Sequence, residues 1–238
     1  MLLLKMLSKT YLVGYIDDLT RKTAEDGKEL YELKVVCLNF YINKMTGMRE
    51  KNMDYYTLVL DPKYFQNVDT YKKGMLVFVD GYLKQKKTKL ELGNPISADI
   101  KVTTIKVMNE NPTDEDIEKN SFAKIFLLGY LYKDPEEVSM ENGSKFYKFG
   151  MGCSHFYVDK ETGIRKTNTD SYYFSLDPKY FRNVEIYKKG MLVFVDGLVR
   201  QRKFEKEGVK VITFDLKVTT IKKIVDAKDD GSSDHLPF

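Results

Sequence analysis

Residues 61–81 read DPKYFQNVDTYKKGMLVFVDG, and residues 177–197 read DPKYFRNVEIYKKGMLVFVDG. The two stretches are identical at 18 of 21 positions, at an offset of 116 residues. Self-similarity of this length at a fixed offset indicates a duplicated structural unit. The chain of 238 residues therefore contains two copies of one fold.

Matches outside these stretches extend the duplication over most of the chain. The same offset pairs Thr46-Gly47 with Thr162-Gly163, and KVTTIK at 101–106 with KVTTIK at 217–222. Each copy then has about 105 residues, a usual length for one domain. The expected organisation is a first domain at 1–108, an acidic linker at 109–120, a second domain at 121–225 and an acidic tail at 226–238.

Each copy has the pattern of a small β-barrel with one helix. Alternating apolar, β-branched and aromatic residues predict five strands in the first copy. After the third strand, Asp61 and Pro62 suit the start of a helix, and Gly74 suits its left-handed end. The second copy repeats this pattern from Asp177 to Gly190. The strands are expected at 11–16, 30–41, 55–60, 75–79 and 100–107.

This order of elements predicts the fold class. A helix between strands three and four of a five-stranded barrel is the OB-fold arrangement. An SH3-like barrel lacks that helix, and a sandwich needs more strands. We therefore expect an all-β protein with two tandem OB-fold Greek-key barrels, each with one helix between strands 3 and 4.

The net charge is unevenly distributed along the chain. The formal net charge is +4, but residues 109–120 carry −4 and residues 226–238 carry −3, so the remainder carries +11. A basic body with acidic appendages suits a polyanionic ligand. A generic soluble surface with scattered lysines is the alternative.

The sequence has few residues for metal binding or catalysis. Cys37 and Cys153 occupy equivalent positions of the two copies, so we expect two separate strand residues and no disulfide. His155 and His235 lie far apart, and His155 is expected within a strand. No CxxC, nucleophile elbow or Gly-rich phosphate loop occurs. We expect no enzyme activity, metal or cofactor.

The chain also has no apolar stretch near the ~18 residues that a membrane helix needs. Its first residues, MLLLKMLS at 1–8, include Lys5 and are not followed by a small-residue cleavage site. The expected location is cytoplasmic.

Each copy resembles the bacterial single-stranded DNA-binding protein (SSB) family. Leu12-Val13-Gly14 and Leu127-Leu128-Gly129 are similar to that family's opening strand. The segment 43–60, NKMTGMREKNMDYYTLVL, is similar to its strand 2–3 hairpin. YKKGMLVFVDG, followed by LKQKK at 83–87 or VRQRKF at 199–204, is similar to the family's fourth-strand signature.

The tandem arrangement resembles a branch of the family with two OB-folds in each chain. In that branch two chains pair, which implies a homodimer with four OB-folds. The family setting implies the nucleoid or replication sites as the location. The richness in Lys, Asn and Tyr favours a low-GC bacterium, a phage or a plasmid as the source.

Residues 232–238, SSDHLPF, resemble the family's C-terminal tip. In the family this tip docks on replication and repair proteins: a Phe ring fills an apolar pocket and acidic residues steer the encounter. His235 departs from the family's usual acid. The implied partner-binding residues are Asp234, Leu236, Pro237 and Phe238.

The resemblance also implies which rings stack on bases. The second copy has Ser171 where the first has Tyr55, and the first copy has Thr88 where the second has Phe204. The two copies are therefore expected to differ in DNA binding. A core or rim aromatic is the alternative role for each ring. The expected stacking rings are Tyr41, Tyr55, Tyr157, Tyr173 and Phe204.

Phosphates require cations along the same surface. An Arg can also stack on a base, which favours the second copy as the stronger binder. Solvated strand faces are the alternative. Tyr56 and Tyr172 alternate with these face residues and are expected to be buried. The expected phosphate ligands are Lys84, Lys86, Lys87, Arg200, Arg202 and Lys203, followed by Arg49, Lys51, Arg165 and Lys166.

Together these features predict a protein that binds and protects single-stranded DNA during replication, recombination and repair, independently of sequence. Its tip is expected to recruit partner proteins. The alternative is an OB-fold interaction protein of weak DNA affinity, of a primosomal type or a phage decoy, that acts mainly through its tip. RNA also remains open as a ligand, because stacking does not read the sugar.

Overall fold

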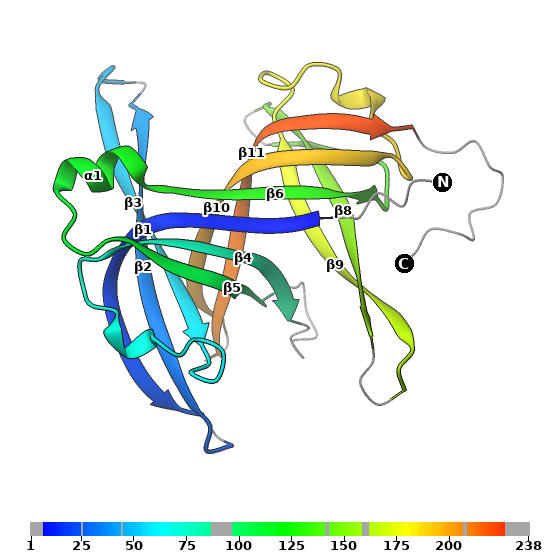
Figure 1. Ribbon diagram of the computed structural model, residues 1–238. Coiled ribbons are helices and arrows are strands. Elements are labelled where there is room, and N and C mark those ends of the chain that lie inside the picture. Colours follow the sequence, from blue (N-terminus) through cyan, green and yellow to red (C-terminus); the bar gives the residue numbers. More distant parts are fainter. Residues whose placement is uncertain are drawn as a thin grey trace. The chain divides into compact units, whose positions relative to one another are not determined.

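The computed structural model describes residues 7–24, 26–43, 45–86, 97–140, 143–158, 162–206 and 209–226 (Figure 1). The first copy consists of β1 (Leu7–Thr23), β2 (Glu29–Ile42), β3 (Arg49–Leu60), β4 (Leu76–Lys86) and β5 (Ser97–Asn109). β1 pairs antiparallel with both β2 and β4, β2 pairs with β3, and β4 pairs with β5. β3 in turn contacts β5. The predicted five-stranded barrel is confirmed, with strands longer than expected.

The second copy repeats this order with one interruption. Its strands are β6 (Phe122–Leu131), β7 (Glu136–Ser139), β8 (Lys145–Val158), β9 (Arg165–Leu176), β10 (Leu192–Lys206) and β11 (Val209–Val225). β8 pairs with β6, β7 and β9, and β10 pairs with β6 and β11. β6 and β7 together correspond to the single strand β1. The break between them contains Pro135, which has no N–H to donate to a neighbouring strand.

The predicted helix between strands 3 and 4 is much shorter than expected in both copies. The segment consists of turns and one three-residue 3₁₀ helix, Val68–Thr70 in the first copy and Val184–Ile186 in the second. Asp61 does cap the segment, since its Oδ1 accepts a hydrogen bond from the N–H of Lys63 at 3.0 Å. Local polar groups then compete with helical hydrogen bonds: the Thr70 hydroxyl, for example, donates to the carbonyl of Asn67 at 2.7 Å.

The acidic linker contains the α-helix of the described residues, α1 (Asp114–Asn120). A capping box stabilises its start: Thr113 accepts from the N–H of Asp116, and the Asp116 carboxylate accepts from the N–H of Thr113. Across the described ranges, no helix is long and apolar enough to span a membrane.

Glycines allow the first two strands of each barrel to approach closely. A Cβ at Gly14 would lie 2.3 Å from the carbonyl oxygen of Val36, and one at Gly129 would lie 2.2 Å from that of Gly152. Beside these glycines lie Cys37 and Cys153, which are free and buried, as expected for strand residues. Burial raises the pKa of both thiols, so both stay protonated at neutral pH.

The described residues form two compact units whose bounds differ from those of the sequence copies. The first unit consists of residues 9–124 and 199–214, and the second unit of residues 125–198, with 7–8 and 215–226. Part of the β10–β11 hairpin of the second copy therefore belongs to the first unit. The expected domain bounds in sequence stay a prediction.

Candidate nucleic-acid interface

An exposed aromatic cluster lies on the outer face of β1, β2 and β3 in the first copy. The strand register places Tyr15 opposite Val36, and Val36 opposite Tyr55. The hydroxyls of Tyr15 and Tyr55 lie 3.9 and 4.0 Å from the sulfur of Met53. Tyr55 is 48% exposed, whereas Val36 beneath the cluster is fully buried. Burial, and secondarily Tyr55, raises the pKa of Tyr15.

A cation, Arg49, and a further ring, Phe40, lie on the same face nearer the turn of the β2–β3 hairpin. The guanidinium of Arg49 lies 4.0 Å from the centre of the Phe40 ring, which is a cation–π contact. Arg49 itself is exposed. Phe40 lies opposite Lys51 in the register, and so shares the outer face with Met53 and Tyr55. We name this set the β2–β3 platform: Tyr15, Phe40, Arg49, Met53 and Tyr55.

The second copy has a smaller aromatic pair. It lies two residues further along the third barrel strand than Tyr55, since Tyr173 corresponds to Thr57. Tyr173 is 51% exposed and lies opposite Gly150. The ring of Tyr132 meets that of Tyr173 edge-on, at 6.0 Å and 79°. A Cβ at Gly150 would lie 2.4 Å from Cζ of Tyr132, so only glycine leaves room for this ring. Burial raises the pKa of Tyr132.

The predicted phosphate ligands are only partly brought together. Lys84 is exposed on β4, and Arg165 and Lys166 are exposed at the start of β9. Arg200 belongs to the first unit, where its Nε lies 2.9 Å from Oδ1 of Asp54.

Other predicted residues lie outside what the structure describes. Lys87 and the tip residues Asp234, Leu236, Pro237 and Phe238 are outside the described ranges. For a second group the strand position is described but the side chain is not. These residues are Tyr41, Lys86, Tyr157, Arg202, Lys203 and Phe204.

Lys51 has a neighbour that the sequence did not indicate. Its Nζ lies 3.7 Å from Oε1 of Glu118 on α1. An acid of the linker thus faces a predicted phosphate ligand on β3.

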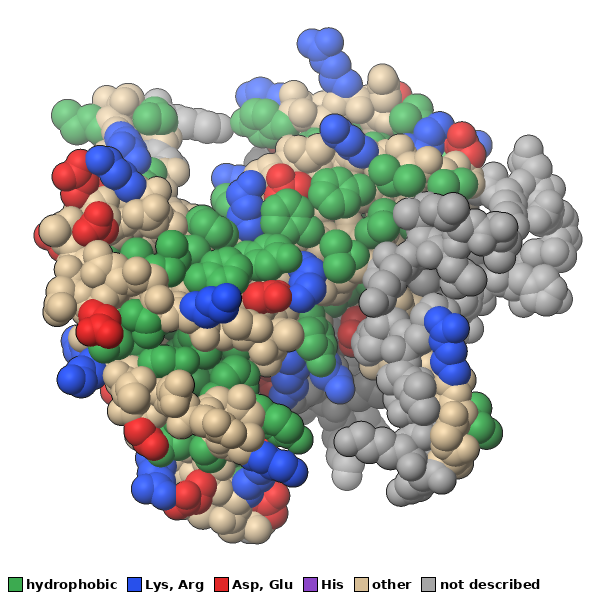
Figure 2. All heavy atoms as spheres, viewed as in Figure 1, with side chains coloured by type: hydrophobic (Ala, Val, Ile, Leu, Met, Phe, Trp, Pro, Cys, Tyr) green, Lys and Arg blue, Asp and Glu red, His purple; other side chains and the backbone are tan. Residues whose placement is uncertain are grey.

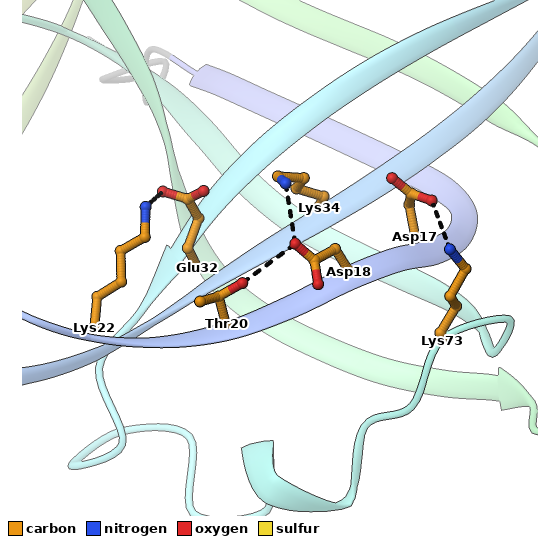
Figure 3. A network of polar contacts seen from close by, with 7 residues as sticks. All are labelled: Asp17, Asp18, Thr20, Lys22, Glu32, Lys34 and Lys73. Atoms are coloured by element: carbon orange, nitrogen blue, oxygen red, sulfur yellow. Dashed lines mark hydrogen bonds and ion pairs between the residues drawn. The ribbon is translucent and has the colours of Figure 1, made fainter.

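Many other cations of the first unit are already paired with acids. On β1 and β2, Lys22 contacts Glu32 at 2.6 Å, and Lys34 contacts Asp18 at 3.0 Å (Figure 3). Figure 2 shows basic and acidic side chains interspersed on the visible surface rather than one uniform basic patch. The described surface therefore offers individual cations such as Arg49 and Arg200 rather than one basic patch.

Tyr56 and Tyr172 are buried, which confirms the prediction that they alternate with face residues. They are 0% and 2% exposed. The Tyr56 hydroxyl donates to the carbonyl of Val199, and the Tyr172 hydroxyl lies 2.6 Å from the hydroxyl of Ser8.

Sequence reasoning missed several residues of these faces. Tyr15, Met53 and Phe40 join the platform only through the cross-strand register, which requires β1, β2 and β3 to be aligned. The duplicated Gly-Tyr pairs at 14–15 and 129–130 were the available signal. Within the described residues, no group of His, Cys, Asp and Glu could hold a metal ion.

Comparisons with known proteins agree with a fold of this kind. The wild-type single-stranded DNA-binding protein from Thermus aquaticus superposes with a TM-score of 0.63 at 13% sequence identity. That alignment covers 98% of this chain and 100% of the Thermus chain. It shows that the chain shares the fold of that structure over nearly its whole length.

Residues 122–224 match the single-strand binding protein family. Single-stranded DNA-binding proteins from two strains of Neisseria meningitidis are each 29% identical over 106 residues, which is 44% of this chain. The chain spans 60% of the length of these relatives. The similarity to the single-strand binding protein family is thus carried by the second copy.

Proposed function

We propose that this protein binds single-stranded DNA without sequence preference and protects it during replication, recombination and repair. The observation that carries the proposal is the β2–β3 platform, where rings and a cation share one exposed strand face. The match of residues 122–224 to the single-strand binding protein family supports it.

The chemistry of the platform suits a single strand better than a duplex. A single strand exposes the flat faces of its bases, and stacking on an aromatic side chain contributes about 1–3 kcal/mol per base. Every base has such a face, so stacking tolerates any sequence. Tyr55 and Tyr173 offer exposed rings of this kind.

The first unit is proposed to bind more strongly than the second. It contains the whole β2–β3 platform and also Arg200, which the sequence assigned to the second copy. In the second unit, the described faces offer Tyr173 with Tyr132 behind it, and the cations Arg165 and Lys166. This reverses the expectation that the arginines favour the second copy.

A fluorescence titration tests the proposal. The chain has 17 Tyr and no Trp, so stacking of bases on tyrosine rings is directly visible as a change in emission. Oligo(dT) should bind with an affinity that falls steeply with salt, since each neutralised phosphate contributes about −0.7 to the slope for single strands. Affinity that is insensitive to salt, or preference for duplex DNA, would contradict the proposal. The matching oligo(rU) titration tests the preference for DNA over RNA.

We further propose that the segment 232–238 recruits replication and repair proteins. Its support is the resemblance of Asp234, Leu236, Pro237 and Phe238 to the family's tip. Deletion of Leu236–Phe238 should leave the oligo(dT) affinity unchanged and abolish binding to a family partner. If the deletion removes nearly all measurable activity, the protein is instead an interaction protein of weak DNA affinity.

The chain is also proposed to pair into a homodimer with four OB-folds. Mass measurement in solution, with and without oligo(dT), tests this. A monomer at micromolar concentration in both conditions would contradict it.

A further inference from the structure

Strand β10, from the sequence of the second copy, is hydrogen-bonded to strand β3 within the first unit. The buried hydroxyl of Tyr56 donates to the carbonyl of Val199. The backbone N–H of Thr57 donates to Oε1 of Gln201 at 3.0 Å. These two contacts hold alternate residues of β10 against consecutive residues of β3, so the residue between Val199 and Gln201 has a fixed place.

That residue, Arg200, contacts a buried acid. Asp54 has a side chain only 6% exposed, and its Oδ1 lies 2.9 Å from Nε of Arg200. Asn39 donates a side-chain hydrogen bond to the same carboxylate, and Asn52 donates another at 3.0 Å. A buried carboxylate requires such donors, because an unpaired buried charge is strongly destabilising.

Arg200 is nevertheless available to a ligand. Its side chain is 48% exposed, and the contact with Asp54 runs through Nε. A guanidinium has five N–H donors in a rigid plane, so one edge can hold Asp54 while the other binds a phosphate. A lysine cannot do both in a fixed geometry.

The first copy has a different cation, a lysine, at the equivalent position. Lys84 corresponds to Arg200 at the offset of 116 residues. It is exposed and makes no ion pair with any described residue. Lys84 therefore offers a mobile charge, whereas Arg200 offers an oriented one.

We propose that Asp54 is a positioning residue for single-stranded DNA, and that it holds Arg200 as a pre-oriented phosphate ligand of the first unit. This inference rests on the proposed function. Holding the side chain in advance avoids the entropy lost when a mobile side chain is ordered on binding. As a result, the second copy supplies part of the DNA site of the first unit.

Titration of full-length variants with oligo(dT) at several salt concentrations tests this. Asp54→Asn should weaken binding about 2- to 10-fold, the effect of mobilising one long side chain. Plain electrostatics predicts the opposite, because removing a negative charge should strengthen binding to DNA. Arg200→Lys should lose nearly as much as Arg200→Ala, although it keeps the charge. Arg200→Ala should also reduce the salt slope by about 0.7.

Double variants separate positioning from direct repulsion. Asp54→Asn combined with Arg200→Ala should bind no more weakly than Arg200→Ala alone, because Asp54 acts through Arg200. Asp54→Asn combined with Lys84→Ala, the matched control, should show additive losses. Thermal unfolding of each variant checks the fold, and Arg200→Lys tests the inference even if Asp54→Asn does not fold.

Three results would overturn the inference: unchanged or tighter binding by Asp54→Asn, full affinity of Arg200→Lys, or additive losses in the Asp54–Arg200 double variant. Failure of the unmodified chain to bind oligo(dT) would instead contradict the proposed function. The two failures are therefore distinguishable.

Discussion

The hairpins β2–β3 and β8–β9 have the same scaffold but different outer faces. Along β3 and β9, the alternate positions whose side chains point inward are nearly unchanged between the copies: Asn52, Asp54, Tyr56 and Leu60 recur as Asn168, Asp170, Tyr172 and Leu176. The outward positions 51, 53, 55, 57 and 59 have no identical counterpart at 167, 169, 171, 173 and 175. The face that forms the barrel is therefore nearly the same in both copies, whereas the outer face differs.

The aromatic clusters of the two copies lie at different positions along their hairpins. The first copy builds its cluster over Val36, with Tyr15 and Tyr55 opposite it in the register. The second copy has Gly152 at the position of Val36 and builds its aromatic pair at Gly150 and Tyr173. The two copies of one barrel therefore have exposed rings at different places.

The largest expected effect comes from removing the exposed ring of the first copy. Tyr55→Ala should weaken oligo(dT) binding about 10-fold, within the range for losing one stacked base. Tyr173→Ala should cost about threefold, because the second unit is proposed to bind more weakly than the first. Fluorescence titration at fixed salt measures both.

Tyr64→Ala is the control, because Tyr64 is 71% exposed on the loop after β3. It should bind within about twofold of the parent chain, since it lies outside both aromatic clusters. Equal losses in Tyr55→Ala and Tyr173→Ala would show that the two copies contribute equally.

A second effect concerns the glycine that makes room for Tyr132. Gly150→Ala places a Cβ against that ring, so we expect destabilisation of about 1–3 kcal/mol from overpacking. The melting temperature should fall by about 2–8 °C, measured by circular dichroism. Ser175→Ala, an exposed position on the neighbouring strand β9, should leave it unchanged. A melting temperature equal to the parent's would show that the ring moves aside at no cost.

The smallest effect concerns the acid that faces Lys51. Glu118→Gln should tighten oligo(dT) binding about twofold at low salt, because it frees a cation of β3, and screening should remove the gain at high salt. Glu115→Gln is the matched control, since Glu115 pairs with Lys119 within α1. Equal gains in both variants would mean that only the net charge of the linker matters.

The sequence was sufficient for the strand order, because apolar alternation and internal duplication are both local patterns. It also predicted correctly that Tyr56 and Tyr172 are buried, since their positions alternate with exposed ones. The helix after β3 was predicted too long, because good end signals at Asp61 and Gly74 outweighed the poor helix formers between them.

The site was less predictable for a different physical reason. Tyr15, Phe40 and Met53 lie far from one another in sequence, and only the ladder of β1, β2 and β3 brings them to one face. The contact between Asp54 and Arg200 joins the two copies across 146 positions of sequence, so no local pattern could indicate it. The resemblance to a family marks single positions but not these neighbours.

Hydrogen–deuterium exchange of the full chain, with and without saturating oligo(dT), tests the unequal roles of the two copies most directly. The account predicts strong protection of Arg49–Leu60 and of residues 199–201, and weaker protection of Arg165–Leu176. Equal protection of β3 and β9, or stronger protection of β9, would contradict it.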